Sequence, residues 1–180
     1  MNSDTALERV NYFSGQLLSA SDLKAEQEYF LARLRRHNRY LHGWGVVSGL
    51  TVSVANSSEV VITSGVAIDC YGNEIHVCPQ LRFPIPNGPK LQFVVIQYAE
   101  TKTSPAPALR GSADPPTVEL SFTRIREGFQ IDIIGVDPTL DHRGKGPGTP
   151  GCGRLHQLCI ARLRKSLRSW KVEPKGRQGA

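Results

Sequence analysis

Residues 11–50 read NYFSGQLLSASDLKAEQEYFLARLRRHNRYLHGWGVVSGL, an apolar segment followed by one amphipathic helix and a glycine-rich exit. No proline or glycine occurs from Asp22 to Tyr40. Apolar residues recur at helical spacing, namely Leu23, Phe30, Leu34 and Leu41. This spacing predicts one long helix with an apolar face, and the rest of the chain is expected to be β-structure attached to it.

Two serines precede this helix and can cap it. The hydroxyl oxygen of Ser19 or Ser21 can accept a hydrogen bond from a free N–H of the first turn, and Asp22 adds negative charge where the helix dipole favours it. We prefer capping to a catalytic role for these serines. Residues 12–18 (YFSGQLL) have the composition of an extended segment that lies on an apolar surface, with a turn at Gly15.

The second half of the helix is rich in arginine. These residues are Arg33, Arg35, Arg36 and Arg39. Positive charge there complements the helix dipole. A solvated face is the simpler interpretation, since charge blocks on helices are mostly solvated. Contact with an acidic partner is the alternative.

Glycines punctuate the exit from the helix. Gly43 suits a C-cap, where a left-handed residue ends a helix. Trp44 offers a large area for burial, and Gly45 permits close approach of a neighbouring backbone. Together with Gly49 they predict a joint that fixes the helix against a sheet, and we expect Trp44 and Phe30 to pack together there.

These residues resemble the opening of a known protein family. The pattern is YF-x-GQLL from Tyr12, EQ-x-YF from Glu26 and HNR-x-LHGWGVV-x-GL from His37. It is similar to phage-tail-like proteins encoded with contractile injection systems, as baseplate or tail-associated components. It is more faintly similar to the N-terminal shell domain of a type VI secretion baseplate subunit.

The likeness continues more weakly along the chain. It includes GVAID-x-YG-x-EI from Gly65, Y-x-ET from Tyr98 and RIREGF from Arg124. The resemblance implies a structural role and brings no catalytic residues with it.

The composition is typical of one globular domain. The chain has 180 residues, with 39% apolar, 21% charged and a formal net charge of +6. The positive charge permits nucleic acid, anionic membrane or acidic protein partners and selects none. No stretch reaches the roughly 20 apolar residues of a membrane helix, and the first residues lack a signal-peptide layout. We therefore expect a cytoplasmic origin and reduced cysteines.

Beyond Leu50 the hydrophobic period changes to two, which predicts strands joined as hairpins. The predicted pairs are 51–54 with 59–63, and 65–68 with 74–77. Asp69, at the second turn, is expected to accept hydrogen bonds from local backbone N–H groups. Residues 81–90 contain three prolines and predict a connector that cannot be a central strand.

Residues 91–98 (LQFVVIQY) form the most apolar predicted strand. It should lie within a sheet with both faces covered. Prolines and small residues over 101–116 predict a long surface loop. Residues 117–126 and 128–134 predict two strands joined as a hairpin around Glu127 and Gly128.

The C-terminal part is less regular. Residues 137–153 predict irregular structure. Alternating apolar residues predict a strand pair over 158–164 and 167–172, with an amphipathic helix over 156–170 as the alternative. Residues 174–180 have the composition of a disordered tail.

One set of residues has the chemistry of a metal site. Cys152, His156 and Cys159 suit zinc, but zinc needs four ligands and only three are local. Buried cysteines that act as small apolar residues are the simpler interpretation. We predict no metal and no cofactor. Because no phosphate loop, nucleophile elbow or His-Glu-x-x-His motif occurs, we also predict no enzymatic activity.

The sequence thus predicts an α+β fold, mainly an antiparallel β-sandwich or barrel with one long N-terminal helix. We expect a docking element over 1–50, a β-domain over 51–173 and a tail over 174–180. The expected function is a structural subunit of a contractile phage-tail-like particle that is released or membrane-anchored. Its expected partners are other particle subunits, in a homo- or hetero-oligomer, with no nucleic acid and no membrane insertion.

The predicted contact residues lie on the apolar segment and the helix. They are Tyr12, Phe13, Leu17, Leu18, Leu23, Phe30, Leu34, Arg35, Arg36 and Arg39. The second hypothesis is a carbohydrate- or receptor-binding module, favoured if Tyr71, Phe83 and Phe129 form an exposed aromatic patch. A cell-wall hydrolase is the third.

Overall fold

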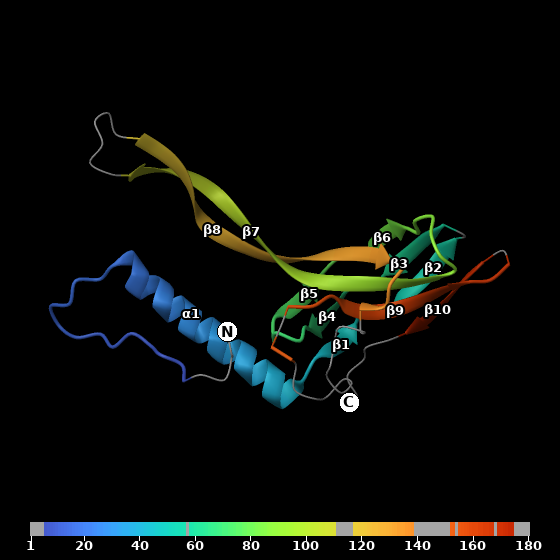
Figure 1. The fold of residues 1–180 in the computed structure, drawn as a ribbon, viewed down its shortest axis with the longest axis horizontal. Coiled ribbons are helices and arrows are strands. Elements are labelled where there is room, and N and C mark those ends of the chain that lie inside the picture. The colour runs from blue at the N-terminus through green and yellow to red at the C-terminus, as the bar shows by residue number, and fades with distance from the viewer. Residues whose placement is uncertain are drawn as a thin grey trace.

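The structure is a computed structural model that describes residues 6–56, 58–110, 117–138, 152–153, 155–167 and 169–174. Within these ranges, a long helix, a short π-helix and ten strands follow one another (Figure 1). They are α1 Ala20–His37, η1 Asn38–His42, β1 Gly45–Gly49, β2 Val52–Asn56, β3 Glu59–Ile62, β4 Gly65–Ile68, β5 Glu74–Val77, β6 Leu81–Pro84, β7 Leu91–Arg110, β8 Thr117–Ile134, β9 Leu158–Lys165 and β10 Trp170–Pro174.

The strands form three antiparallel sheets. Their orders are β1-β4-β5, β10-β9-β7-β8 and β2-β3-β6. All three contribute to one hydrophobic core, because Val46, Ile62 and Ile96 from the three sheets belong to the same buried cluster. The predicted α+β class, with mainly antiparallel sheet and one long N-terminal helix, is confirmed.

Several predicted strand pairs are confirmed. β2 pairs with β3, β4 with β5, and β9 with β10. The helical alternative for residues 156–170 is therefore wrong. β7 lies between β9 and β8, and Phe93–Ile96 are almost fully buried, so the inner half of β7 is covered on both faces as predicted.

The outer half of β7 differs from the prediction. Residues 101–110 do not form a loop but continue β7 and pair with β8. β8 is one strand and not a hairpin, since Gly128 lies opposite Ala99 within the ladder. β9 pairs with Leu91–Ile96 and not with the outer part of β7. Among the described strands, that part of β7 therefore has one unpaired edge. Proline, which has no backbone N–H to donate, is tolerated at such an edge.

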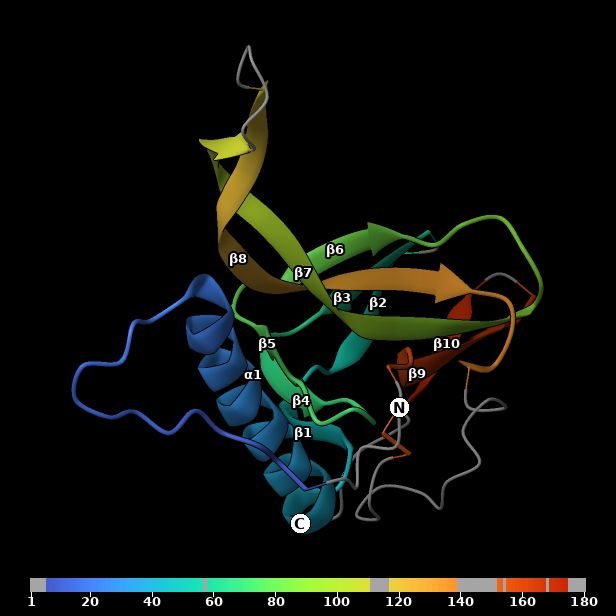
Figure 2. The same cartoon turned by 60° about the vertical axis from the view of Figure 1, so that its left-hand side comes forward.

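We name residues 101–110 and 117–126 the arm. The arm is a two-stranded ribbon that projects beyond the three sheets, at the same end of the molecule as α1 (Figures 1 and 2). The predicted loop residues 111–116 lie outside the described residues.

Two smaller boundaries also differ. The connector 81–90 contains strand β6, which is an edge strand as its proline requires. Pro174, placed in the tail by the sequence, is the last residue of β10 and pairs with Ala161. Residues 139–151 of the predicted irregular region and 175–180 of the predicted tail lie outside the described residues.

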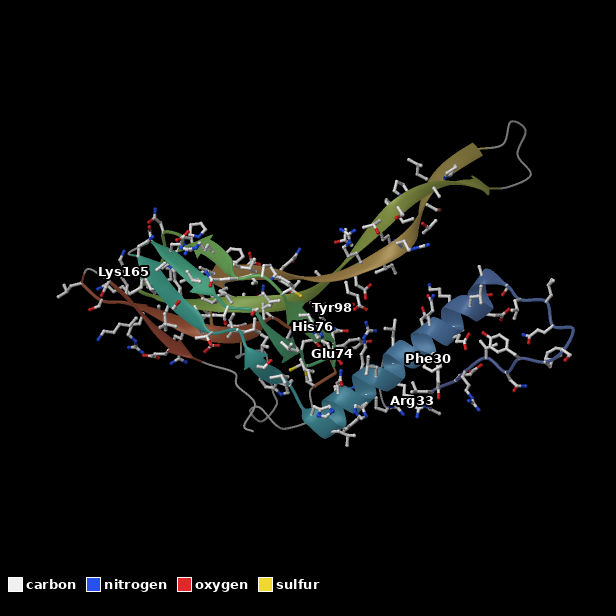
Figure 3. The ribbon with its side chains drawn as sticks, turned by 180° about the vertical axis from the view of Figure 1, so that it is seen from behind. Phe30, Arg33, Glu74, His76, Tyr98 and Lys165 are labelled. Atoms are coloured by element: carbon white, nitrogen blue, oxygen red, sulfur yellow. The ribbon has the colours of Figure 1, made fainter. Side chains whose placement is uncertain are left out.

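The predicted joint between helix and sheet needs one correction. Gly43 ends η1 with a φ of 72°, and Gly45 and Gly49 also have positive φ. Trp44 is 6% exposed and belongs to the main core. Phe30, however, is 57% exposed, so its predicted packing against Trp44 is wrong. The reason is that α1 points away from the sheets and only its C-terminal end reaches them (Figure 3).

Candidate docking site

The N-terminus of α1 is capped by the predicted serine. The Ser19 Oγ accepts a hydrogen bond of 3.2 Å from the Asp22 N–H, and the Ser19 N–H donates one of 2.9 Å to the Asp22 carboxylate. A hydrogen bond of 2.6 Å from the Ser19 hydroxyl to the Asp22 carboxylate, followed by the one from the Ser19 N–H, holds the pKa of Asp22 below its ordinary value. The reciprocal pair satisfies two backbone donors, so α1 has a defined start far from the core.

The N-terminal segment, residues 6–18, precedes α1 and runs alongside it. It turns at Gly15, whose φ is 86°, and the Tyr12 hydroxyl donates a hydrogen bond to the Glu26 carboxylate on the helix. A groove of about 970 Å³ runs between residues 6–11 and the helix, where it is lined by Ala25, Tyr29 and Ala32 among others. The segment therefore lies beside the helix without closing on it.

Apolar side chains stand exposed along the segment and the helix. Phe13 is 67% exposed and Leu17 is 93% exposed. We name Leu23, Phe30 and Leu34 the helix stripe, and they are 52%, 57% and 49% exposed. Every residue of α1 is described, and none of them is buried. The helix thus contributes little to the core of its own chain.

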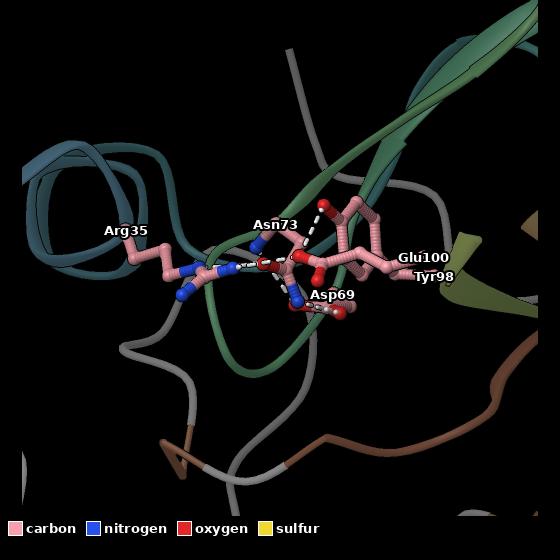
Figure 4. Close-up of polar contacts among 5 residues, drawn as sticks. All are labelled: Arg35, Asp69, Asn73, Tyr98 and Glu100. Carbon is pink, nitrogen blue, oxygen red and sulfur yellow. Dashed lines mark hydrogen bonds and ion pairs between the residues drawn. The ribbon is translucent and has the colours of Figure 1, made fainter. Parts of the chain in front are cut away.

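Arg35 attaches the helix to the sheets. Its Nε donates a hydrogen bond of 2.7 Å to the Asn73 Oδ1, and its guanidinium lies 3.6 Å from the Glu100 carboxylate (Figure 4). The same group lies 4.9 Å from the centre of the Tyr71 ring. These contacts hold the last turn of α1 against the β4–β5 turn and the inner part of β7.

Asn38, at the start of η1, makes a second attachment. It is 3% exposed, and its Nδ2 donates hydrogen bonds to the Gly72 carbonyl oxygen at 3.0 Å and to the Glu74 carboxylate at 3.2 Å. The bond from Asn38, followed by one from His76, holds the pKa of Glu74 below its ordinary value. We name the contacts of Arg35 and Asn38 with residues 71–74 and 100 the polar joint.

Asp69 shapes the turn that receives the helix. Its Oδ1 accepts hydrogen bonds of 2.9 Å from the N–H groups of Tyr71 and Asn73, and its Oδ2 accepts one of 2.8 Å from the Asn73 amide. This confirms the predicted local role of Asp69. Burial raises the pKa of this carboxyl against the opposing effect of those hydrogen bonds. These hydrogen bonds fix the turn from within, apart from its contacts with the helix.

The arginines do not form a uniform solvated face. Arg35 belongs to the polar joint, and Arg39 is 7% exposed and lies 5.3 Å from the centre of the Tyr40 ring. Arg33 stands on the projecting helix (Figure 3). The first role of Arg35 and Arg39 is therefore within the chain, and their contact with a partner stays a prediction.

Sequence reasoning missed the residues on the sheet side of the joint. Gly72 and Asn73 come from the β4–β5 turn, and Glu100 comes from β7, all far from the helix in sequence. The one available signal was the turn sequence DCYGN at 69–73. Asparagine and glycine there indicate a turn but not the helix that packs on it.

The aromatic patch of the second hypothesis does not form. Phe83 and Phe129 pack against the main core. Tyr71 instead lines a shallow cavity of about 470 Å³ with Tyr98, whose hydroxyl donates a hydrogen bond of 2.9 Å to Glu100. Burial raises the pKa of Tyr98. These three residues therefore do not form the exposed aromatic patch that would favour a carbohydrate- or receptor-binding module.

The zinc candidates have different neighbours in the fold. Cys159 is buried with Phe93 and Val95, and its thiol donates to the Ala161 carbonyl oxygen. Cys152 lies instead beside Cys70, since the Gly153 N–H donates to the Cys70 carbonyl oxygen. Within the described part of the chain, no group of three or more His, Cys, Asp or Glu side chains could hold a metal ion. Cys152, His156 and Cys159 therefore do not form such a group.

Comparison with known proteins gives a likeness of fold. No family model matches this chain, and no curated protein sequence matches it. A chain in "Structure of the type VI secretion system TssK-TssF-TssG baseplate subcomplex revealed by cryo-electron microscopy" is similar with a TM-score of 0.51 and 11% identity, over 94% of this chain and 61% of that one. A chain in "Crystal structure of TssK" is similar with a TM-score of 0.48 and 10% identity. This likeness covers 93% of this chain and 41% of that one.

This chain thus spans 61% and 41% of the lengths of those two chains. At 11% identity, the first likeness shows a shared arrangement of helix and sheets that is distant in sequence. Among the described residues, no helix combines the length and the hydropathy needed to cross a membrane.

Proposed function

We propose that this protein is a structural subunit of a contractile phage-tail-like particle, and that it docks to other subunits through the N-terminal segment and α1. One observation carries the proposal, which is the helix stripe. An 18-residue helix gains most of its stability in proteins from packing an apolar face. Within the described part of the chain, the apolar face of α1 is left exposed, and exposed apolar patches of this kind mark protein interfaces.

The polar joint supports the same proposal. A helix held at one end by Arg35 and Asn38, and capped at the other by Ser19, is presented at a fixed angle to the sheets. Such preorganisation lowers the entropy cost of binding a partner. The polar joint therefore positions the docking surface and need not touch the partner itself.

The likeness of fold gives independent support. The similar chain comes from a baseplate subcomplex of a type VI secretion system, in which several subunits assemble together. We propose that this chain likewise assembles with other particle subunits in the cytoplasm. The division into a docking element over 1–50 and a β-domain over 51–173 stays part of this proposal, although β1 pairs with β4 and so belongs structurally to the β-domain.

Deletion of residues 1–18 tests the proposal. Tagged full-length and truncated chains are expressed in the organism that encodes them, and tail-like particles are purified by sedimentation. We expect the full chain to sediment with the particles and the truncated chain to stay in the supernatant while remaining folded by circular dichroism. Equal incorporation of the folded truncated chain, or catalytic turnover by the full chain, would contradict the proposal.

A further inference from the structure

Cys70 and Cys152 lie side by side although they are far apart in the sequence. The Gly153 N–H donates a hydrogen bond of 3.0 Å to the Cys70 carbonyl oxygen, and Cys152 lies close enough to the Cys70 thiol to influence its pKa. Hydrogen-bonded backbone segments run about 5 Å apart. A disulfide spans about 4.4 to 6.8 Å between Cα atoms, so the spacing of two segments joined by a backbone hydrogen bond is compatible with one.

The four cysteines differ in accessibility. All four are among the described residues, and no disulfide joins them in this structure. Cys70 and Cys159 are buried, whereas Cys78 and Cys152 are exposed. Cys159 packs in a separate cluster with Phe93 and Val95. Cys152 is therefore the accessible member of a close pair, and Cys78 is an accessible thiol for comparison.

We propose that Cys70 and Cys152 are a redox-controlled pair that closes into a disulfide when a low-molecular-weight disulfide, such as glutathione disulfide, is in excess. The inference rests on the adjacency of the two residues and does not depend on the proposed function. Its product is a cross-link between the segment at 152–153 and the β4–β5 turn.

The reaction begins at Cys152. Its thiolate attacks one sulfur of glutathione disulfide, forms a mixed disulfide and releases one glutathione thiolate. Burial raises the pKa of the Cys70 thiol to about 12, so Cys70 reacts second, from its position beside the mixed disulfide. Cys70 loses its proton to solvent, attacks the Cys152 sulfur and releases the second glutathione. The two cysteines lose two electrons, and glutathione disulfide is reduced to two glutathione molecules.

The cross-link would act on the polar joint. Cys70 directly follows Asp69, which fixes the turn that receives Arg35 and Asn38. A disulfide at Cys70 ties this turn to a second segment of the chain. Reducing conditions keep such a pair open, and transfer to an oxidising compartment closes it.

The test uses the full chain in glutathione buffers that range from fully reduced to fully oxidised. Free thiols are trapped with an alkylating reagent, and the protein is digested without reduction and analysed by mass spectrometry. We expect a Cys70–Cys152 linked peptide that accumulates with oxidation and disappears with dithiothreitol. The Cys78→Ser variant should form the same Cys70–Cys152 linkage to the same extent. The urea concentration at the midpoint of unfolding of this variant should rise on oxidation.

The Cys152→Ser variant provides the matched control. Its substitution is at an exposed side chain, so we expect it to fold, to leave Cys70 unlinked and to show no rise in the urea midpoint on oxidation. The proposal is overturned if oxidised wild-type protein carries glutathione on Cys152 while Cys70 stays a free thiol. Linkage of Cys152 to Cys78 in preference to Cys70 would also overturn it.

Discussion

Gly72 lies so close to Arg35 that a Cβ atom on Gly72 would stand 2.2 Å from the Arg35 carbonyl oxygen. The backbone of the β4–β5 turn and the last turn of α1 are therefore in direct contact. Glycine also suits this position because its φ is 94°, a conformation that side chains disfavour. The direction of α1 thus depends on a residue with no side chain.

Gly72→Ala should loosen the polar joint. Positive φ costs an alanine about 1–2 kcal/mol, and overpacking adds typically about 1–3 kcal/mol, so we expect a total loss of roughly 2–5 kcal/mol in urea unfolding. Hydrogen exchange should also accelerate at residues 35–38. Gly15→Ala is the matched control, since Gly15 has a φ of 86° but nothing within 4 Å of its added Cβ. Equal losses for the two variants would show that the close contact is unimportant.

Truncation of Trp44 should cost far more stability than truncation of Phe30. Trp44→Ala removes a side chain that is 6% exposed and belongs to the core, and should cost about 3–5 kcal/mol in denaturant unfolding. Phe30→Ala removes one that is 57% exposed, and should cost less than about 1 kcal/mol. A large loss for Phe30→Ala in the free chain would show that α1 packs against its own sheets.

Glu74 should give the polar joint a dependence on acid. Its folded pKa is lowered, chiefly by the hydrogen bond from Asn38, from an ordinary value of 4.5. The ionised carboxylate therefore stabilises the fold above pH 4.5, and this contribution is lost as the pH falls through the lower folded value.

The measurement compares wild type with Glu74→Gln by urea unfolding between pH 7 and pH 3. We expect wild type to be modestly more stable near neutral pH and the difference to shrink toward pH 3. The effect is small because the carboxyl is partly exposed and screened by solvent. A difference that stays constant across this range would exclude the assigned role of the charge.

The sequence predicted the parts of the fold that depend on nearby residues. Ser19 and Asp22 mark the start of α1 three residues apart, and alternating apolar residues mark β2 to β5. The arm was missed because Pro105 and Pro107 usually exclude a strand. Here they pair opposite Phe122 and Leu120 on a ribbon with an open edge, and a single sequence does not show that an edge is open.

The candidate site could be predicted only in part, because contacts between residues far apart in the sequence are not visible in a single sequence. The segment and the helix were predicted to carry the contact residues, which stays a prediction, whereas Phe30 was expected to pack against Trp44 and is exposed instead. The polar joint was not expected, because the partners of Arg35 and Asn38 lie in the β4–β5 turn, β5 and β7, far from the helix in sequence. Likewise, Cys70 and Cys152 are brought together by folding and not by a local motif.

Photo-crosslinking from position 30 tests the central claim most directly. A photoreactive phenylalanine derivative replaces Phe30 in the full chain, and another replaces Leu167, which is fully exposed on a different part of the molecule. Both chains are incorporated into particles and irradiated, and crosslinked peptides are identified by mass spectrometry. The proposal predicts that position 30 crosslinks to a neighbouring subunit at high yield and that position 167 does so at least several-fold less. Particles that contain the position 30 chain but yield no crosslink from it to any neighbour would contradict the assignment of α1 as the docking surface.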